Sequence, residues 1–173
     1  MALTTTPGAL NADSLASLAE AEAYMGMILP AYKDAWAAAD DQTKESVLRQ
    51  ASMLLYPLPW VGHRASQGQP LCWPRIPALS NFTLFGGLRD SDGYPIDSTT
   101  IPWQVKNATV AFAFRLLSED RTADAGALVP TDLKSGTTSI TGLKRNPIPA
   151  EVLDMVSPLL RCDPRYSAEL VRS

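Results

Sequence analysis

The sequence has few of the side chains that carry most enzyme and metal chemistry. His63 is the only histidine among 173 residues, and cysteine occurs only at Cys72 and Cys162. A single histidine excludes most histidine-based metal sites, and any Ser/His/Asp or Cys/His pairing would depend on that one residue. The Gly86-Gly87 pair lacks the glycine spacing and the following lysine of a nucleotide-binding loop. We therefore expect a protein that is not an enzyme and that has no cofactor.

An excess of positive charge is also missing, and so are long apolar runs. Lysine and arginine number 15 against 18 aspartates and glutamates, a net charge of −3 at pH 7. Proteins that wrap nucleic acid usually carry a basic domain, so a nonspecific DNA clamp is disfavoured. No apolar run approaches the roughly 20 residues of a membrane span, and the first residues lack the basic region and apolar core of a signal peptide. We expect a soluble chain with free thiols, made in a reducing cytoplasm and without a membrane partner.

The charge that is present lies unevenly along the chain. Residues 1–56 hold three basic and seven acidic side chains, a net −4, so residues 57–173 carry +1. An acidic half and a weakly basic half suit head-to-tail self-association of the chain. A solvated acidic face would explain the same pattern equally well.

Apolar residues at helical spacing predict a mainly α fold. Residues 17–20 read Ser-Leu-Ala-Glu, a capping box in which the hydroxyl and the carboxylate each satisfy a free backbone N–H, so a helix should run from Ser17 to about Met27. Four more helices are expected, and they follow Pro30, Asp40 or Asp41, Pro102 and Pro149. The helix after Pro102 is apolar on more than one side, which predicts that it is the central helix of a small bundle.

The middle of the chain is predicted to lack long helices. Seven of the 14 prolines lie between Pro57 and Pro102, which predicts a long proline-rich loop or arm over residues 57–100. Residues 128–142 switch to threonine, valine, leucine and isoleucine around a Ser-Gly turn, a pattern typical of a short β-hairpin.

The two ends of the chain are predicted to be extended. Residues 1–12 are small and polar and indicate a mobile or partner-bound arm. Residues 162–173 should form an extended C-terminal tail, because Pro164 disfavours helix at the residue before it. We expect residues 1–161 to form a single helical domain.

The stretch from Trp60 to Arg75 is aromatic and basic, but prolines in and around it exclude a helix interior or a central strand. Its candidate functional residues are two tryptophans and two arginines: Trp60, Arg64, Trp73 and Arg75. On single-stranded DNA such rings could stack on bases while the guanidinium groups meet phosphates, at roughly 1 to 3 kcal/mol per stacked base. Alternatively, the indoles close the helical core and the arginines satisfy loop carbonyls or acids of the N-terminal half. We favour this packing interpretation.

The same stretch carries a family resemblance. Residues 60–64 read Trp-x-Gly-x-Arg, and residues 68–75 read Gly-Gln-x-Leu-x-Trp-Pro-Arg. Shorter patterns follow the same order at residues 11–14, 17–21, 92–93, 101–108 and 134–136. Together they resemble a tailed-bacteriophage family of head-tail connector, or adaptor, proteins, which also carries the label DnaT-like single-stranded DNA-binding protein. Residues 76–90 look like an insertion relative to the usual pattern, so the resemblance implies nothing there.

The resemblance implies a structural protein of the virion neck, located at the head-tail junction and synthesised in the bacterial host cytoplasm. It implies a closed ring of about twelve copies between the portal protein and a downstream tail-completion or tail protein. DNA would pass through the lumen without sequence-specific binding. The label leaves an alternative open, which is a DnaT-like single-stranded DNA-binding protein of phage DNA replication.

Two sets of residues are expected to contact partners. An apolar loop tip and one hairpin residue should contact neighbouring subunits of the ring: Phe82, Leu84, Phe85 and Ile140. Apolar anchors and bases of the tail should bind the portal: Arg165, Tyr166, Leu170, Val171 and Arg172. A frayed terminus is the alternative for the tail.

Overall fold

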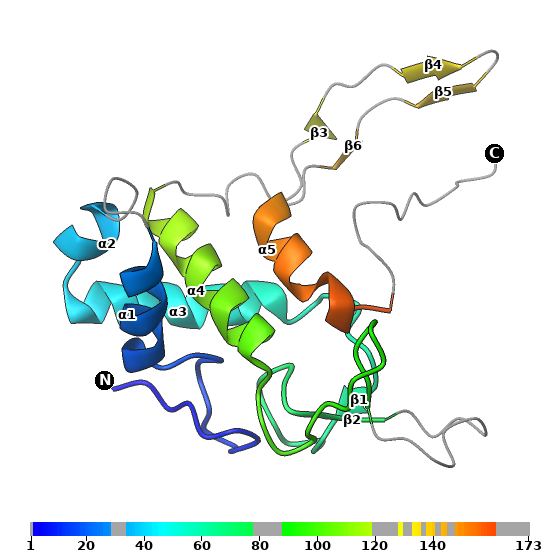
Figure 1. The fold of residues 1–173 in the computed structure, drawn as a ribbon. Helices are drawn as coiled ribbons and strands as arrows, with labels where there is room; N and C mark the ends of the chain where they lie inside the picture. The colour runs from blue at the N-terminus through cyan, green and yellow to red at the C-terminus, as the bar shows by residue number, and fades with distance from the viewer. Residues whose placement is uncertain are drawn as a thin grey trace.

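The computed structural model describes these parts of the chain: residues 2–28, 34–77, 88–118, 128–129, 133–135, 138–140, 143–144 and 148–161. Five α-helices lie in them, followed by one 3-10 helix: α1 (Leu18–Met27), α2 (Asp34–Ala38), α3 (Asp41–Leu55), α4 (Trp103–Ser118), α5 (Ala150–Val156) and η2 (Ser157–Leu159). The prediction of a mainly α bundle is confirmed (Figure 1). None of the helices in these parts is long and apolar enough to cross a membrane.

Local sequence signals set the helix ends. Ser17 Oγ accepts a 3.2 Å bond from Glu20 N, and Glu20 Oε2 accepts a 2.8 Å bond from Ser17 N, which completes the predicted capping box of α1. Asp40 caps α3 by accepting a 2.9 Å bond from the backbone N–H of the third helical residue. Pro102 directly precedes α4, and Pro149 is the N-cap of α5. The predicted starts of these helices are confirmed.

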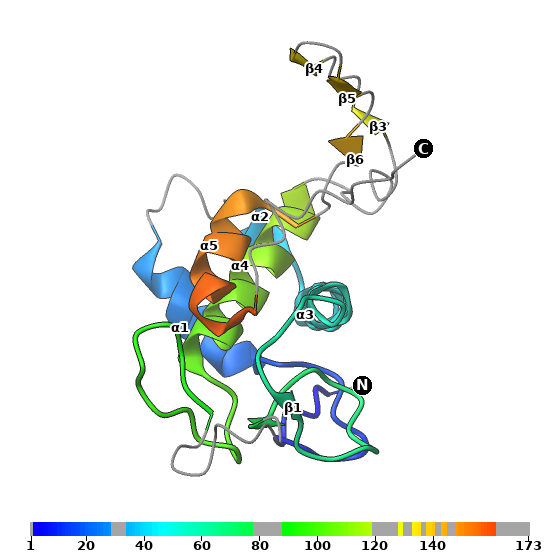
Figure 2. The same ribbon diagram turned by 90° about the vertical axis from the view of Figure 1, so that its right-hand side faces the viewer.

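The helix α4 lies at the centre of the bundle. Seven of its residues are buried: Val105, Ala108, Thr109, Val110, Ala111, Phe112 and Ala113. It contacts α1, α2, α3 and α5, and Figure 2, which looks along α3, shows α4 and α5 on the same side of that helix. A helix covered on several faces needs apolar residues around most of its circumference, which is the pattern that the sequence shows.

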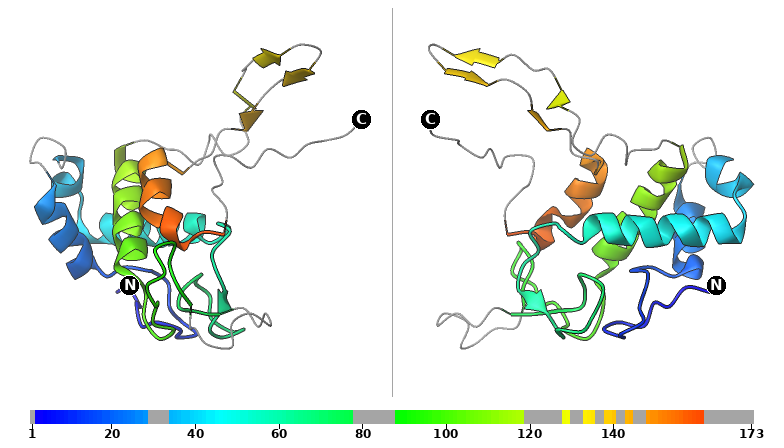
Figure 3. Two further views of the ribbon diagram at one scale, coloured as in Figure 1. Left: turned by 45° about the vertical axis from the view of Figure 1, so that its right-hand side comes forward. Right: turned by 180° about the vertical axis from the view of Figure 1, so that it is seen from behind.

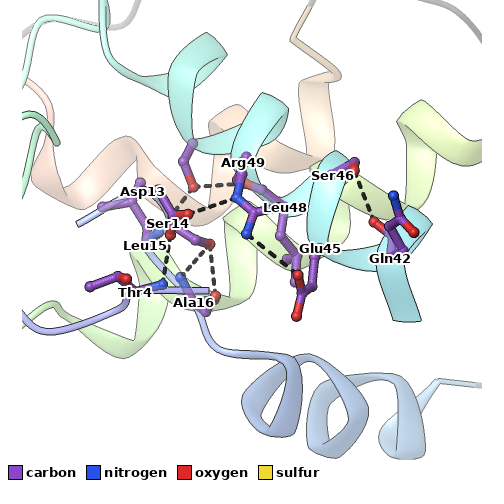
Figure 4. A network of polar contacts seen from close by, with 11 residues as sticks. Thr4, Asp13, Ser14, Leu15, Ala16, Gln42, Glu45, Ser46, Leu48 and Arg49 are labelled. Atoms are coloured by element: carbon purple, nitrogen blue, oxygen red, sulfur yellow. Dashed lines mark hydrogen bonds and ion pairs between the residues drawn. The ribbon is translucent and has the colours of Figure 1, made fainter. Parts of the chain in front are cut away.

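The N-terminal segment, residues 2–16, is held on α3, so the prediction of a mobile arm is wrong for residues 2–12, while the alternative of a partner-bound arm stays a prediction. Three of the segment's apolar side chains are buried: Ala12, Leu15 and Ala16. Asp13 Oδ1 accepts from Thr4 N at 2.7 Å, and Asp13 Oδ2 accepts from Arg49 Nε of α3 at 2.7 Å (Figure 4). A charge-assisted bond between residues 36 positions apart leaves no local pattern in the sequence.

Six short strands form three antiparallel pairs in the described parts of the chain: β1 (His63–Arg64) with β2 (Arg75–Ile76), β3 (Leu128–Val129) with β6 (Leu143–Lys144), and β4 (Leu133–Ser135) with β5 (Thr138–Ile140). The β4–β5 pair is the predicted hairpin, with Ser135 opposite Thr138. Figures 1 and 3 show this ribbon projecting from the helical body.

Glu20 should make the stability of the bundle depend on pH. Burial raises the pKa of Glu20, but its hydrogen bonds with Lys106 and Ser17 lower it, and the net result is a pKa below its ordinary value. Because the folded pKa is depressed, the stabilisation is complete above the unfolded value of about 4.3 and is lost as pH falls through the folded value. Replacing Glu20 with glutamine should therefore lower the free energy of unfolding at pH 7 by about 0.5 to 1 kcal/mol, since the pair with Lys106 is partly exposed.

Urea unfolding of both proteins at neutral pH and near pH 3 measures this difference. The difference should be smaller at the lower pH, because the pKa of Glu20 is depressed in the folded state. An equal difference at both pH values would show that the charge of Glu20 has no part in it.

Candidate functional site

The tryptophan and arginine motif forms one closed loop, residues 60–76, here named the signature loop. Its prolines prevent longer strands, and β1 and β2 close it with an antiparallel pair of two residues each. Trp60 also forms an antiparallel bridge with Leu160, directly after η2. The loop is therefore attached both to itself and to the C-terminal part of the described chain.

Both tryptophans of the signature loop lie in the core. Trp60 is 3% exposed and Trp73 is 0% exposed. Their rings meet edge to face, with centroids 5.7 Å apart and an angle of 85° between the planes, a favourable aromatic geometry. Trp60 Nε1 also donates to the carbonyl of Leu55, the last residue of α3, at 3.0 Å. Neither ring is available to stack on a nucleic-acid base, and both hold the loop against the helices.

Arg75 is committed to the backbone of its own loop. Arg75 Nε donates to Val61 O at 2.6 Å, and Nη2 donates to Gly62 O at 2.7 Å. Arg75 Nη1 donates to Cys72 O at 3.0 Å. All three guanidinium nitrogens therefore bind carbonyl oxygens rather than acids of the N-terminal half.

Two more side chains hold the loop, and sequence reasoning assigned neither of them a role. Gln69 is 1% exposed, and its amide nitrogen donates to Leu71 O and Pro74 O at 2.9 and 3.0 Å. Arg161 Nη2 donates at 2.8 Å to Gly62 O, the oxygen that Arg75 also binds. The position of Gln69 inside the motif could have indicated that its polar side chain holds the loop. Arg161 lies 99 positions from its partner, and no sequence pattern points to that contact.

A polar hollow of about 250 Å³, here named the arginine pocket, lies on the solvent side of the loop. The side chains that line it come from the residues just after α3 and from the signature loop: Tyr56, Leu58, Trp60, His63, Arg64, Cys72 and Arg75. Arg64 Nη1 donates to Gln69 O at 2.7 Å, and its guanidinium lies 5.9 Å from the centre of the Tyr56 ring. Within the described residues no carboxylate lines this pocket. It can therefore attract an anion.

The pocket does not have the chemistry of an active site. Cys72 is a free thiol that is 1% exposed. Burial raises the pKa of Cys72 to about 12, although the charge of Arg75 opposes the shift. A thiol with so high a pKa is a poor nucleophile. The described residues contain no group of three or more His, Cys, Asp or Glu side chains that could hold a metal ion.

Alkylation measures the accessibility of this thiol. In a Cys162→Ser variant, Cys72 is the sole cysteine, and it should react with iodoacetamide at pH 8 at least about a hundredfold more slowly in the folded protein than in urea. Rapid reaction of the folded protein would show that the signature loop opens readily and that the indoles are not securely packed.

The other predicted site residues lie largely outside the described parts. Phe82, Leu84 and Phe85 fall in residues 78–87, and the portal-binding residues fall in residues 162–173. Ile140 lies in β5, where its backbone is paired with Leu133 of β4. Their predicted contacts with other subunits or with the portal stay predictions.

Comparison with known proteins adds one finding. A family model described as "Putative DnaT-like ssDNA binding protein" matches residues 1–173. The chain belongs to this family. No curated protein and no solved structure matches the chain. The family match covers the whole DnaT-like chain. A more specific function has to be argued from the geometry of the signature loop.

In the described parts of this DnaT-like chain, two of the three exposed tyrosine and tryptophan rings lie beside acids. Tyr94 and Trp103 are 70% and 68% exposed and line a hollow of about 470 Å³. Three carboxylates line the same hollow: Asp90, Asp92 and Asp97. Such a surface repels DNA phosphates. Tyr56, which is 42% exposed, and the exposed imidazole of His63 line the arginine pocket.

Proposed function

We propose that this DnaT-like chain is a structural protein of a bacteriophage neck, a head-tail connector that forms a closed ring between the portal and the tail. DNA passes through its lumen without being bound in a sequence-specific way. The proposed partners are further copies of the chain, the portal protein and a downstream tail protein, and the proposed location is the head-tail junction of the virion. The proposal includes no catalytic activity.

One observation carries this proposal: the signature loop uses its DNA-binding residue types for packing. Trp60 and Trp73 are buried against each other, and each guanidinium nitrogen of Arg75 donates to a backbone carbonyl. A motif used in this way supports a rigid structural joint better than a stacking platform. The net charge of −3 also suits a lumen through which a duplex slides, because basic walls would hold its phosphates.

Single-stranded DNA binding is the second candidate, and the family description favours it directly. The arginine pocket supports it as well, because Arg64 lies beside the exposed ring of Tyr56. Two exposed rings, Tyr56 and His63, and a small basic pocket would engage about one or two nucleotides, far fewer than the roughly 4 to 16 nucleotides held by dedicated single-strand binders. We therefore place this function second.

A titration and a reconstitution separate the two candidates. Fluorescence anisotropy of a labelled single-stranded oligonucleotide should show no saturable binding at micromolar protein and about 0.2 M salt, a condition that weakens nonspecific phosphate contacts. The same protein should co-sediment with purified portal rings. A chain ending at Arg161 tests the tail and should keep its helical content but fail to join the portal. Tight binding to the oligonucleotide without binding to the portal would establish the second candidate instead.

A further inference from the structure

Charged side chains of opposite sign gather at the two ends of α3. The helix has 15 residues and so spans about 22 Å. In Figures 1 and 3, α2 lies at the N-terminal end of α3, and β1 and β2 lie at its C-terminal end. We name these ends the acidic pole, made of Asp34, Asp40 and Asp41, and the basic pole, made of Arg64, Arg75 and Arg161.

The acidic pole is not neutralised by any base that the structure describes. All three aspartates are exposed, and none forms an ion pair within the described parts of the chain. The two bases of α3 are already bound to other carboxylates. Lys44 pairs with Glu22 at 2.8 Å, and Arg49 pairs with Asp13 at 2.7 Å. A cation from outside the described residues can therefore pair with these carboxylates.

The basic pole has the opposite imbalance. Its three arginines bind backbone carbonyls, and none of them pairs with a carboxylate of the described residues. Burial lowers the pKa of Arg75, and the like charges of Arg161 and Arg64 add to that shift. Arg161 is exposed and Arg64 is half-buried. Three positive charges close together are stabilised by an anion from outside the subunit.

We propose that the basic pole of one copy binds the acidic pole of the next copy, with Arg64 and Arg161 of one protomer pairing with Asp34 and Asp41 of its neighbour. Because two different surfaces meet, the contact is heterologous and repeats head to tail, and it closes into a ring when the rotation between neighbours divides a full turn. This inference rests on the proposed connector function, which requires such a ring.

A carboxylate partner on a second copy fits the basic pole better than a DNA strand does. Guanidinium groups bind carboxylates with two parallel hydrogen bonds, and the chain itself supplies exposed carboxylates about one helix length away. Residues 1–56 carry a net −4, which would repel a phosphate backbone that ran along the molecule. The charge complementarity of the two poles therefore indicates self-association.

Reversing the charges of one pole at a time gives two variants. Each should self-associate poorly alone, and the two should associate when they are mixed. The first carries Arg64→Glu, and the second carries Asp34→Arg with Asp41→Arg. Each variant alone brings like charges together at the contact, although Arg161 stays positive in the first and Asp40 stays negative in the second, so its self-association at about 50 mM salt should weaken at least about tenfold. In an equal mixture the two variants can alternate around the ring. The reversed basic pole of the first variant then meets the reversed acidic pole of the second, and the next contact joins two unaltered poles. Association should therefore return to the level of the unaltered chain. Sedimentation velocity across a range of protein concentrations measures all three samples.

Arg89→Glu and Asp92→Arg are matched controls, because both residues are exposed and lie outside the two poles. These variants should associate like the unaltered chain. An unaltered chain that stays monomeric, an equal loss in the controls, or no recovery in the mixture would overturn the proposed contact. The proposed contact would also be overturned if an Arg64→Glu variant associates normally but loses oligonucleotide binding. The arginine pocket would then be a phosphate-binding site. Portal binding of the unaltered chain decides the connector function separately.

Discussion

Replacing Trp73 with alanine is expected to lower the free energy of unfolding by about 3 to 5 kcal/mol, because a large buried side chain is lost from the core. The indole is 0% exposed and packs edge to face on Trp60. Its loss removes the transfer free energy of a large apolar ring and leaves a cavity between the signature loop and the helices. Urea unfolding followed by far-ultraviolet circular dichroism measures the change.

Trp103→Ala is the matched control for this prediction. Trp103 is 68% exposed at the start of α4, so its removal should change stability by no more than about 0.5 kcal/mol. If Trp73→Ala unfolds at the same urea concentration as the unaltered protein and loses only the binding of DNA or a partner, the ring is exposed in solution and the packing account is wrong.

Gly62→Ala should be the second most damaging change, at about 2 to 5 kcal/mol. Gly62 has a φ of +68°, in the left-handed region that a side chain disfavours. A Cβ at this position would lie 2.2 Å from the carbonyl oxygen of Ile76, so the backbone of the loop would have to move. The carbonyl of Gly62 accepts from both Arg75 and Arg161, and the same movement would weaken those bonds.

Gly93→Ala separates the two causes of that loss. Gly93 also has a positive φ, +87°, but nothing lies within 4 Å of a Cβ added there. Its replacement should cost only the backbone strain, about 1 to 2 kcal/mol. Equal losses at the two positions, measured by the same urea unfolding, would show that the close approach of Ile76 to Gly62 does not contribute.

The parts of the fold that could be predicted are those set by neighbouring residues. The capping box of Ser17 and Glu20 fixes the start of α1, and Pro102 and Pro149 mark the starts of α4 and α5. In each case the signal and the structure lie within one helical turn, so the pattern is visible in the sequence. The hairpin of β4 and β5 was visible for the same reason, through its turn residues.

The parts that could not be predicted depend on partners far apart in the chain. Asp13 and Arg49 hold the N-terminal segment on α3 across 36 positions, and Arg161 reaches Gly62 across 99. The sequence shows Arg49 and Arg161 only as positive charges, because the partner of each side chain depends on the tertiary fold. The sequence singled out the residues of the signature loop, whereas the position of Arg161 beside that loop is visible only in the structure.

The most direct test of the account is an image of the virion neck. Electron cryomicroscopy of particles assembled with this chain should show a closed ring between the portal and the tail, with each subunit fitting the helical body in which α4 is the central helix and α3 reaches toward the neighbouring copy. A neck that lacks the chain altogether would contradict the connector function.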